Sequence, residues 1–206
     1  MSEPRLQKRS FLELDVAIPV DALRAEVASL PASAWRPTWW ANVHGSVAIV
    51  LLRGGSEGTA DDFITDAVAD QPVLATLPGI AQLIGSEGPF GGCTYGFLFR
   101  MAPHGVAHLH VDGHPVWHRH HRVHVPITTH PDAVLVADGR ACHLEPGRAW
   151  TFDNQSQHGF ANGGGERVHL IVDVPDGPAL RRLLDGGRHH PGVVDEAAVR
   201  RIAHAR

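Results

Sequence analysis

The chemistry that this sequence could support begins with the tripeptide His110-Val111-Asp112 and with His158. In an extended strand, residues i and i+2 project to the same face, so we expect His110 and Asp112 to point together. A third ligand has to come from another strand, and His158 lies far enough along the chain to do so. Two imidazoles and one carboxylate hold a divalent metal on one side and leave the other side open, which suits Fe(II) and oxygen. We therefore predict that His110, Asp112 and His158 are the metal ligands and the catalytic centre.

This tripeptide lies in a stretch that is rich in histidine. Twelve of the sixteen histidines fall between His104 and His169, so a His-x-Asp spacing can also arise by chance. Histidines in excess of the ligands would belong to a solvated loop beside the site or make pH-responsive contacts with a substrate. These additional histidines are His104, His108, His114, His118, His120 and His121.

Arg167 follows His158 by nine residues. If the two residues lie on neighbouring strands, the guanidinium of Arg167 enters the metal cavity and can hold a carboxylate by two parallel hydrogen bonds. A dicarboxylate cosubstrate that chelates the metal at one end would need such an anchor at the other end. The alternative is a surface arginine that pairs with Glu166.

An Arg-x-His pattern occurs twice, at Arg122-Val123-His124 and at Arg167-Val168-His169. In a strand, the arginine and the histidine of each pattern project to one face. Two such strands would line a cavity with cationic and hydrogen-bonding groups, which suits a substrate that carries carboxylates. Alternatively, both are ordinary half-buried strands, and backbone carbonyls satisfy His124 and His169.

Length, composition and charge limit the classes of function. A chain of 206 residues with 43% hydrophobic residues suits one domain, which we place at residues 1–206. The net charge of -4 offers no basic surface for nucleic acid or anionic lipid. No apolar run reaches the length of a signal peptide or a membrane span, so we expect a cytoplasmic protein with small soluble partners. We expect Cys93 and Cys142 to be reduced and structural, with a disulfide as the alternative.

Short strand-like segments follow one another from residue 94 to about residue 174, separated by Gly, Pro, Asn and Asp. The predicted strands are 94–101, 106–111, 122–127, 133–136, 141–144, 149–152, 158–161 and 167–172. Without intervening helices, they favour a mainly β fold, most economically a double-stranded β-helix, or jelly roll. The candidate ligands lie inside this predicted core.

The flanking segments predict structural elements around that core. We expect strands at 12–18 and 46–53, a helix at 21–30 capped by Asp21, and one or two short helices within 61–83. Two helices follow the core at 178–184 and 196–203, the second capped by Asp195 and solvated at the surface without a function. Trp35, Trp39 and Trp40 either wall a substrate entrance or pack beneath a loop.

The ordered set of motifs resembles a known family. Along the chain, the set comprises His110-x-Asp112, Arg122-x-His124-Val125-Pro126, 144–154, His158, Asn162 and Arg167-Val168-His169-Leu170-x-x-Asp173. This order is similar to that of the aspartyl/asparaginyl β-hydroxylase family of Fe(II)- and 2-oxoglutarate-dependent dioxygenases, to which hydroxylases of free proline are related. The resemblance covers residues 94–174 well and the first ninety residues loosely.

The resemblance implies a role for each matching residue. His110 and His158 would be the metal histidines, and Arg167 would bind the far carboxylate of 2-oxoglutarate. Arg122 and His124 match an arginine and a histidine that face cosubstrate and substrate, and we assign His124 and His169 to the cosubstrate. Some members lack the carboxylate ligand that Asp112 supplies here. The segment 113–121 is longer than in the mammalian-type hydroxylases, and a histidine stands near position 120 where the family can have a substrate-binding arginine.

The predicted reaction is hydroxylation of an unactivated C–H bond with Fe(II), 2-oxoglutarate and O2. We expect Arg122, with Arg100 or Trp117, to position the substrate. That substrate would be an amino acid, an amino-acid derivative or a peptidyl Asp/Asn-type side chain. The alternatives are a cupin-like metal enzyme that does not use 2-oxoglutarate and a non-catalytic metal-binding module in which the histidine cluster binds Zn(II) or Ni(II).

Overall fold

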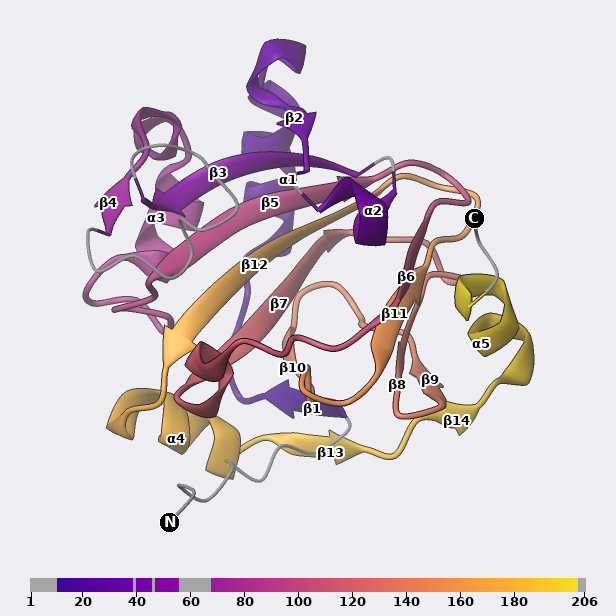
Figure 1. Cartoon of the computed structure of the whole chain (residues 1–206). Helices are drawn as coiled ribbons and strands as arrows, with labels where there is room; N and C mark the ends of the chain where they lie inside the picture. Colours follow the sequence, from indigo (N-terminus) through magenta and orange to yellow (C-terminus); the bar gives the residue numbers. More distant parts are fainter. Residues whose placement is uncertain (1–10, 39, 46, 56–67, 204–206) are drawn as a thin grey trace.

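The computed structural model describes residues 11–38, 40–45, 47–55 and 68–203, which fold around two facing antiparallel sheets (Figure 1). The larger sheet has nine strands and the smaller has five among the described residues. The predicted jelly roll is confirmed, because all eight strands expected between residues 94 and 174 form and divide equally between the sheets. Except for the consecutive pair at residues 134–137 and 140–142, which share the smaller sheet, successive strands of the series belong to opposite sheets, as in a double-stranded β-helix.

The larger sheet holds the longest strands of the core. In spatial order its strands are β13 (Arg188–His190), β1 (Phe11–Leu14), β10 (Ala149–Thr151), β7 (His120–Thr128), β12 (Arg167–Pro175), β5 (Tyr95–Met101), β3 (Ala48–Gly54) and β2 (Arg36–Pro37), and β4 (Ala69–Asp70) also pairs with β3. Within β12, Val168, Leu170 and Val172 belong to the outer apolar cluster, whereas Ile171 belongs to the cluster between the sheets. This alternation leaves the intervening polar residues of β12 on the inner face.

The smaller sheet carries both candidate metal histidines. In spatial order its strands are β14 (Val193–Val194), β9 (Arg140–Cys142), β8 (Val134–Ala137), β11 (His158–Ala161) and β6 (Val106–His110). Phe97 and Phe99 of the larger sheet pack with Ala107 and Phe160 of the smaller sheet to form the apolar layer between them. The sequence did not lead us to expect β13 and β14, which extend the two sheets after residue 187.

Helices cover the outer faces of both sheets. The helices are α1 (Val20–Ser29), α2 (Ala41–His44), α3 (Pro78–Ile84), α4 (Pro178–Asp185) and α5 (Glu196–Ala203), with short 3-10 turns at Ala32–Ala34, Pro72–Thr76 and Pro115–His118. The predicted short helices within 61–83 are confirmed from residue 72 onward, whereas residues 61–67 lie outside the described ranges. None of these helices is long and apolar enough to cross a membrane.

Two predictions about helix ends and surfaces need correction. Asp21 does not cap α1, because the helix begins one residue earlier after Pro19, and the Asp21 carboxylate pairs with Arg24 instead. Helix α5 is not merely solvated, because Ala198 and Ile202 are buried against the smaller sheet. The predicted cap of α5 is confirmed, since Asp195 Oδ1 accepts a hydrogen bond of 2.9 Å from the backbone nitrogen of Ala198.

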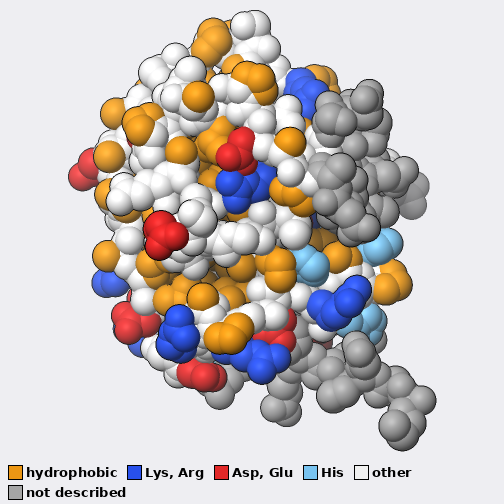
Figure 2. Space-filling view, turned by 90° about the vertical axis from the view of Figure 1, so that its left-hand side faces the viewer, with side chains coloured by type: hydrophobic (Ala, Val, Ile, Leu, Met, Phe, Trp, Pro, Cys, Tyr) orange, Lys and Arg blue, Asp and Glu red, His pale blue; other side chains and the backbone are white. Residues whose placement is uncertain are grey.

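The described surface mixes charges of both signs. On the face in Figure 2, which is the end of the molecule near β4 and α3, acidic and basic side chains are interspersed among apolar ones. Cys93 and Cys142 are both free cysteines in the structure. Burial raises the pKa of each thiol to about 11, so both stay protonated at neutral pH.

Candidate functional site

The predicted metal ligands meet at one end of the smaller sheet. Each of His110, Asp112 and His158 offers a ligand atom, and these atoms lie within 4.8 Å of one another. The strands β6 and β11 place His110 directly opposite His158, and the two ring centroids are 4.2 Å apart. Gly159 allows this close approach of the strands, because a Cβ there would lie 2.7 Å from the carbonyl oxygen of Ala107.

Backbone carbonyls orient both imidazoles. The Nδ1 atom of His110 lies 2.7 Å from the carbonyl oxygen of His108, and Nδ1 of His158 lies 3.0 Å from that of Ser156. A carbonyl only accepts hydrogen bonds, so these contacts assign the proton to Nδ1 and leave each Nε2 with its lone pair for a metal. Burial first, and the neighbouring charge of His110 second, lower the pKa of His158 to about 4, so this ring is neutral at pH 7.

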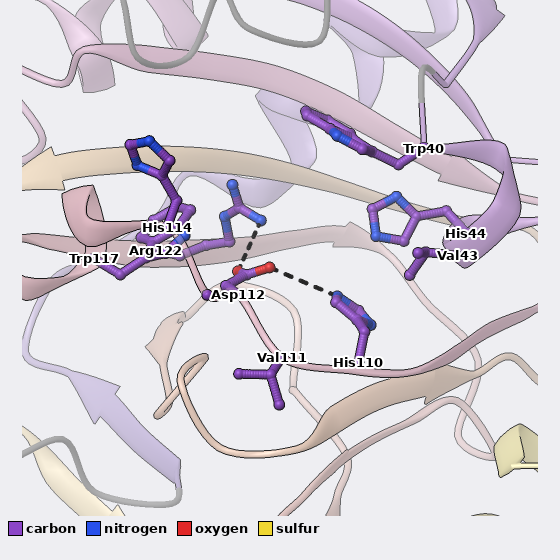
Figure 3. Close-up of a pocket in the computed structure, with 10 residues that line it drawn as sticks. Trp40, Val43, His44, His110, Val111, Asp112, His114, Trp117 and Arg122 are labelled. Atoms are coloured by element: carbon purple, nitrogen blue, oxygen red, sulfur yellow. Dashed lines mark hydrogen bonds and ion pairs between the residues drawn. The ribbon is translucent and has the colours of Figure 1, made fainter.

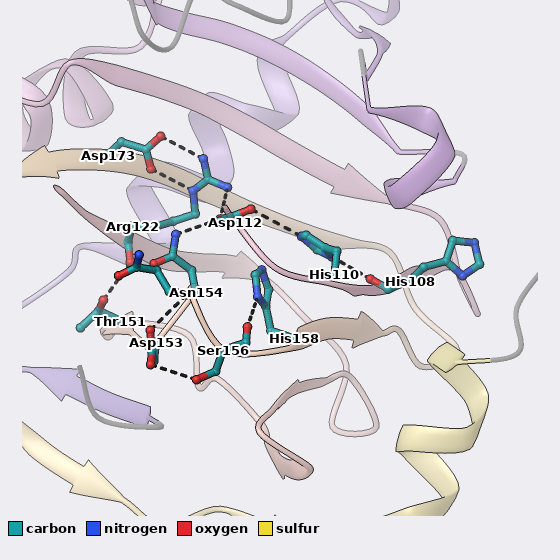
Figure 4. Close-up of polar contacts among 11 residues, drawn as sticks. His108, His110, Asp112, Arg122, Thr151, Asp153, Asn154, Ser156, His158 and Asp173 are labelled. Carbon is teal, nitrogen blue, oxygen red and sulfur yellow. Dashed lines mark hydrogen bonds and ion pairs between the residues drawn. The ribbon is translucent and has the colours of Figure 1, made fainter. Parts of the chain in front are cut away.

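Asp112 is held by one oxygen and leaves the other free for a metal. Its Oδ2 accepts hydrogen bonds from Asn154 Nδ2 at 2.8 Å and from the Arg122 guanidinium at 3.4 Å (Figure 4). Oδ1 lies 3.8 Å from Nε2 of His110. Although burial opposes ionisation, the nearby charge of Arg122 contributes most to holding the pKa of Asp112 below its usual value. The donor set is therefore one carboxylate and two imidazoles, which fits Fe(II).

Arg122 joins this carboxylate to the larger sheet. Its Nε and Nη2 atoms each donate to Asp173 at 2.9 Å, forming a bidentate pair that is almost fully buried. The register of β7 and β12 explains the pair, because Arg122 and Asp173 are direct cross-strand partners. The predicted placement of Arg122 and His124 on one face is confirmed, since both line the space between the sheets.

A cavity of about 230 Å³ opens in front of the candidate metal ligands (Figure 3). It is lined by Trp40, Val43, His44, His110, Val111, Asp112, Gly113, His114, Trp117 and Arg122. The buried Trp117 ring lies 4.5 Å below the Arg122 guanidinium carbon. Trp117 and Arg122, which the sequence suggested as substrate contacts, therefore both line this cavity.

His44 is a residue of this cavity that the sequence did not reveal. Its ring centroid lies 5.4 Å from that of His110 and 5.3 Å from that of Phe99. Burial, followed by the charge of His110, lowers the pKa of His44 to about 3. His44 lies in α2, before the predicted core of residues 94–174, and belongs to no spaced motif, so only the packing of α2 against β6 brings it to the site.

A second polar group lies deeper between the sheets, around Arg167. The guanidinium donates to Nδ1 of His169 at 3.0 Å, stacks 4.3 Å from the Phe160 ring, and its Nη1 has no hydrogen-bond partner among the described residues. Burial lowers the pKa of Arg167 to about 9, so the group is a cation at neutral pH. The surface alternative is wrong, because Arg167 is only 2% exposed and Glu166 lies near Arg100 instead.

The route by which Arg167 reaches the interior differs from the prediction. His158 and Arg167 do not lie on neighbouring strands, because β11 pairs with β6 and β8, whereas β12 pairs with β5 and β7. The connection after Ala161 crosses from one sheet to the other. Both side chains nevertheless point between the sheets, where Phe160 of β11 lies against the guanidinium.

His124 and His169 lie next to Arg167 and have unpaired ring atoms. Neither ring nitrogen of His124 has a hydrogen-bond partner within the described ranges, and the same holds for Nε2 of His169. The alternative that backbone carbonyls satisfy these rings is therefore not supported. Because buried polar groups are normally paired, these atoms and Nη1 of Arg167 are hydrogen-bonding groups that an anionic ligand between the sheets could satisfy.

The remaining predicted contacts divide between the cavity and the surface. Arg100 does not line the cavity: it stacks 4.1 Å from the Trp35 ring on the opposite face of β5 from Phe99. Alternation along the strand explains this outward position. Trp40 walls the cavity as one alternative proposed, Trp35 instead packs with Arg100, and Trp39 lies outside the described residues.

Replacing Asn154 by alanine should weaken metal binding. The change removes a donor to Asp112 Oδ2 but keeps the backbone oxygen to which the amide of Asp112 donates at 3.0 Å. We expect the affinity for Mn(II), measured by titration calorimetry, to fall about 10-fold to 100-fold. The exposed neighbour Gln157 provides the control. Equal affinities of Asn154→Ala and Gln157→Ala would contradict this role.

The metal-free protein should lose stability in acid. Burial lowers the pKa of His44, His124, His158 and His169 in the fold, so the unfolded chain takes up more protons than the folded chain below about pH 6.5. The free energy of unfolding should therefore fall from about pH 6.5 towards pH 4, as measured by urea denaturation. His124→Phe should reduce the slope by about 1.4 kcal/mol per pH unit. An unchanged slope, equal to that of a variant of the exposed His189, would contradict the assignment.

Comparison with known proteins identifies the family. A sequence model described as aspartyl/asparaginyl β-hydroxylase matches residues 63–176, which is more than half of the chain. A 2OG-Fe(II) oxygenase family oxidoreductase from Burkholderia pseudomallei superposes with a TM-score of 0.50 at 14% identity, over 85% of this chain and 80% of that chain. A viral collagen prolyl hydroxylase from Paramecium Bursaria Chlorella virus-1 gives a TM-score of 0.50 at 8% identity, over 82% and 97%. These likenesses show the fold, and no curated protein matches the sequence. The family match confirms the predicted resemblance: the chain belongs to the aspartyl/asparaginyl β-hydroxylase family.

Proposed function

We propose that the protein is an Fe(II)- and 2-oxoglutarate-dependent dioxygenase that hydroxylates an unactivated C–H bond. One observation carries this proposal. The cluster of His110, Asp112 and His158 and the buried cation Arg167, which lacks a partner for its Nη1 among the described residues, lie between the same two sheets. The proposal also takes residues 1–206 as one dioxygenase domain, which the pairing of β1 and β13 with the core sheet supports.

The residues of this chain would divide the work of binding between them. Nε2 of both histidines and Oδ1 of Asp112 would hold the metal, and Arg167 would bind the far carboxylate of 2-oxoglutarate by charge-assisted hydrogen bonds. Nε2 of His169 and the ring of His124 would complete the binding of that anion. Bound Fe(II), 2-oxoglutarate and O2 would supply the oxidising power for the hydroxylation, with succinate and CO2 as coproducts.

The cavity in front of the ligands would receive the substrate. Trp117 and the Arg122 side chain would position it, while Trp40 and Phe99 would keep bulk water from the reacting groups. We propose an amino acid, an amino-acid derivative or a peptidyl Asp/Asn-type side chain as the substrate. A cupin-like enzyme without 2-oxoglutarate, or a non-catalytic metal module, would leave the buried Arg167 without a ligand to bind.

Variants of the two proposed binding groups test this function. With Fe(II) and a panel of amino acids and peptides, His158→Ala should abolish succinate formation, because it removes a metal ligand. Arg167→Ala should raise the KM for 2-oxoglutarate about a hundredfold, since a buried charge pair is lost. Arg100→Ala is the matched control, because Arg100 lies outside the cavity. Full turnover by His158→Ala, or a KM for Arg167→Ala equal to that of the Arg100 control, would overturn the proposal.

A further inference from the structure

Arg122 is the single lysine or arginine among the described residues that line the substrate cavity. The sequence suggested that this guanidinium binds a substrate carboxylate, but two of its nitrogens already donate to Asp173 at 2.9 Å. Its third nitrogen, Nη1, lies 3.4 Å from Oδ2 of Asp112.

Stacking fixes Arg122 in this orientation. The guanidinium carbon lies 4.5 Å from the Trp117 ring and 5.9 Å from the Phe97 ring. An arginine that is held by a bidentate carboxylate and by an aromatic face has little freedom to turn towards a ligand. In this fold, the positive charge of Arg122 is therefore neutralised by the carboxylates of Asp173 and Asp112.

The charges of the proposed centre balance before a substrate enters. This step rests on the proposed function. A divalent metal and the guanidinium groups of Arg122 and Arg167 carry the positive charge. The carboxylates of Asp112 and Asp173 and the 2-oxoglutarate dianion carry an equal negative charge. A substrate carboxylate in the cavity would add a negative charge without a partner. Burying an unpaired charge is costly, so the cavity disfavours such a group.

The other walls of the cavity suit an uncharged group. Trp40, Val43, Val111 and Trp117 offer apolar contact. His44 lines the same cavity, and its buried Nδ1 has no hydrogen-bond partner within the described part of the chain. A neutral imidazole can donate a hydrogen bond to a carboxamide or accept one from it, and neither contact places a net charge in the cavity.

We propose that the substrate presents an uncharged side chain to this cavity, an asparaginyl-type carboxamide or a hydrocarbon, and that Asp173 enforces this choice by neutralising Arg122. Any carboxylate that the substrate carries lies outside the cavity. The specificity thus depends on Asp173, a residue that touches neither the metal ligands nor the substrate. Its effect is exerted through the charge of Arg122.

Binding of two isosteric probes tests the proposal. The full chain, loaded with Zn(II) and 2-oxoglutarate so that no turnover occurs, is titrated with N-acetyl-asparagine N-methylamide and with N-acetyl-aspartate N-methylamide. Tryptophan fluorescence reports binding, because Trp40 and Trp117 line the cavity. Wild type should bind the asparaginyl probe more tightly, and Asp173→Asn should bind the aspartyl probe about tenfold more tightly than wild type does. Asp176→Asn, which removes a carboxylate from the surface pair with Arg181, should change neither affinity.

Two results would overturn the proposal. One is wild-type binding of the aspartyl probe that is as tight as that of the asparaginyl probe, which decides the question even if Asp173→Asn does not fold. The other is a folded Asp173→Asn variant without any gain for the aspartyl probe. The double variant Arg122→Gln/Asp173→Asn should lose the gain. Succinate formation by the Fe(II)-loaded wild type tests the proposed function separately, so a failure of that function is distinguishable from a failure of this specificity.

Discussion

The ion pairs of Arg122 connect the two sheets at the point where the chemistry would occur. Asp173 on β12 holds Arg122 on β7, and Arg122 reaches across to Asp112, which lies two residues after the end of strand β6 in the smaller sheet. In a buried network of this kind, removal of one partner leaves an uncompensated charge, at a cost of about 3–5 kcal/mol. The orientation of Asp112, and hence the shape of the proposed metal site, depends on this network and on Asn154.

The two sheets of the jelly roll carry different binding groups: the smaller sheet carries the candidate metal-binding histidines, and the larger sheet carries the residues that would bind the anion. The smaller sheet contributes His110 and His158 at a cross-strand pair, where backbone carbonyls fix both rings. The larger sheet contributes Arg167 and His169 on the inner face of β12. An aromatic layer that includes Phe160 lies between them. This arrangement places a cation beyond the metal ligands without a direct ion pair to them, which suits a ligand with a negative group at each end.

Alternation and spacing made much of this structure predictable from the sequence. The strands of the core and the shared face of Arg122 and His124 follow from a period of two, which backbone geometry imposes. The pairing of Arg122 with Asp173 was not predictable, because register depends on which strands become neighbours. The same reason explains the wrong expectation that β11 and β12 are adjacent. The outward position of Arg100 follows instead from alternation along β5, where Phe99 points inward. His44 reaches the site through the packing of a single short helix, for which the sequence carries no periodic signal.

A crystal structure of the protein with Mn(II) and 2-oxoglutarate, grown without oxygen, would test the central claim most directly. The account predicts one metal ion that is bonded to Nε2 of His110, Nε2 of His158 and Oδ1 of Asp112. It also predicts that the far carboxylate of 2-oxoglutarate is bound to Arg167 between the sheets. A metal that is held instead by histidines of the 114–121 segment, or a cosubstrate that makes no contact with Arg167, would contradict it.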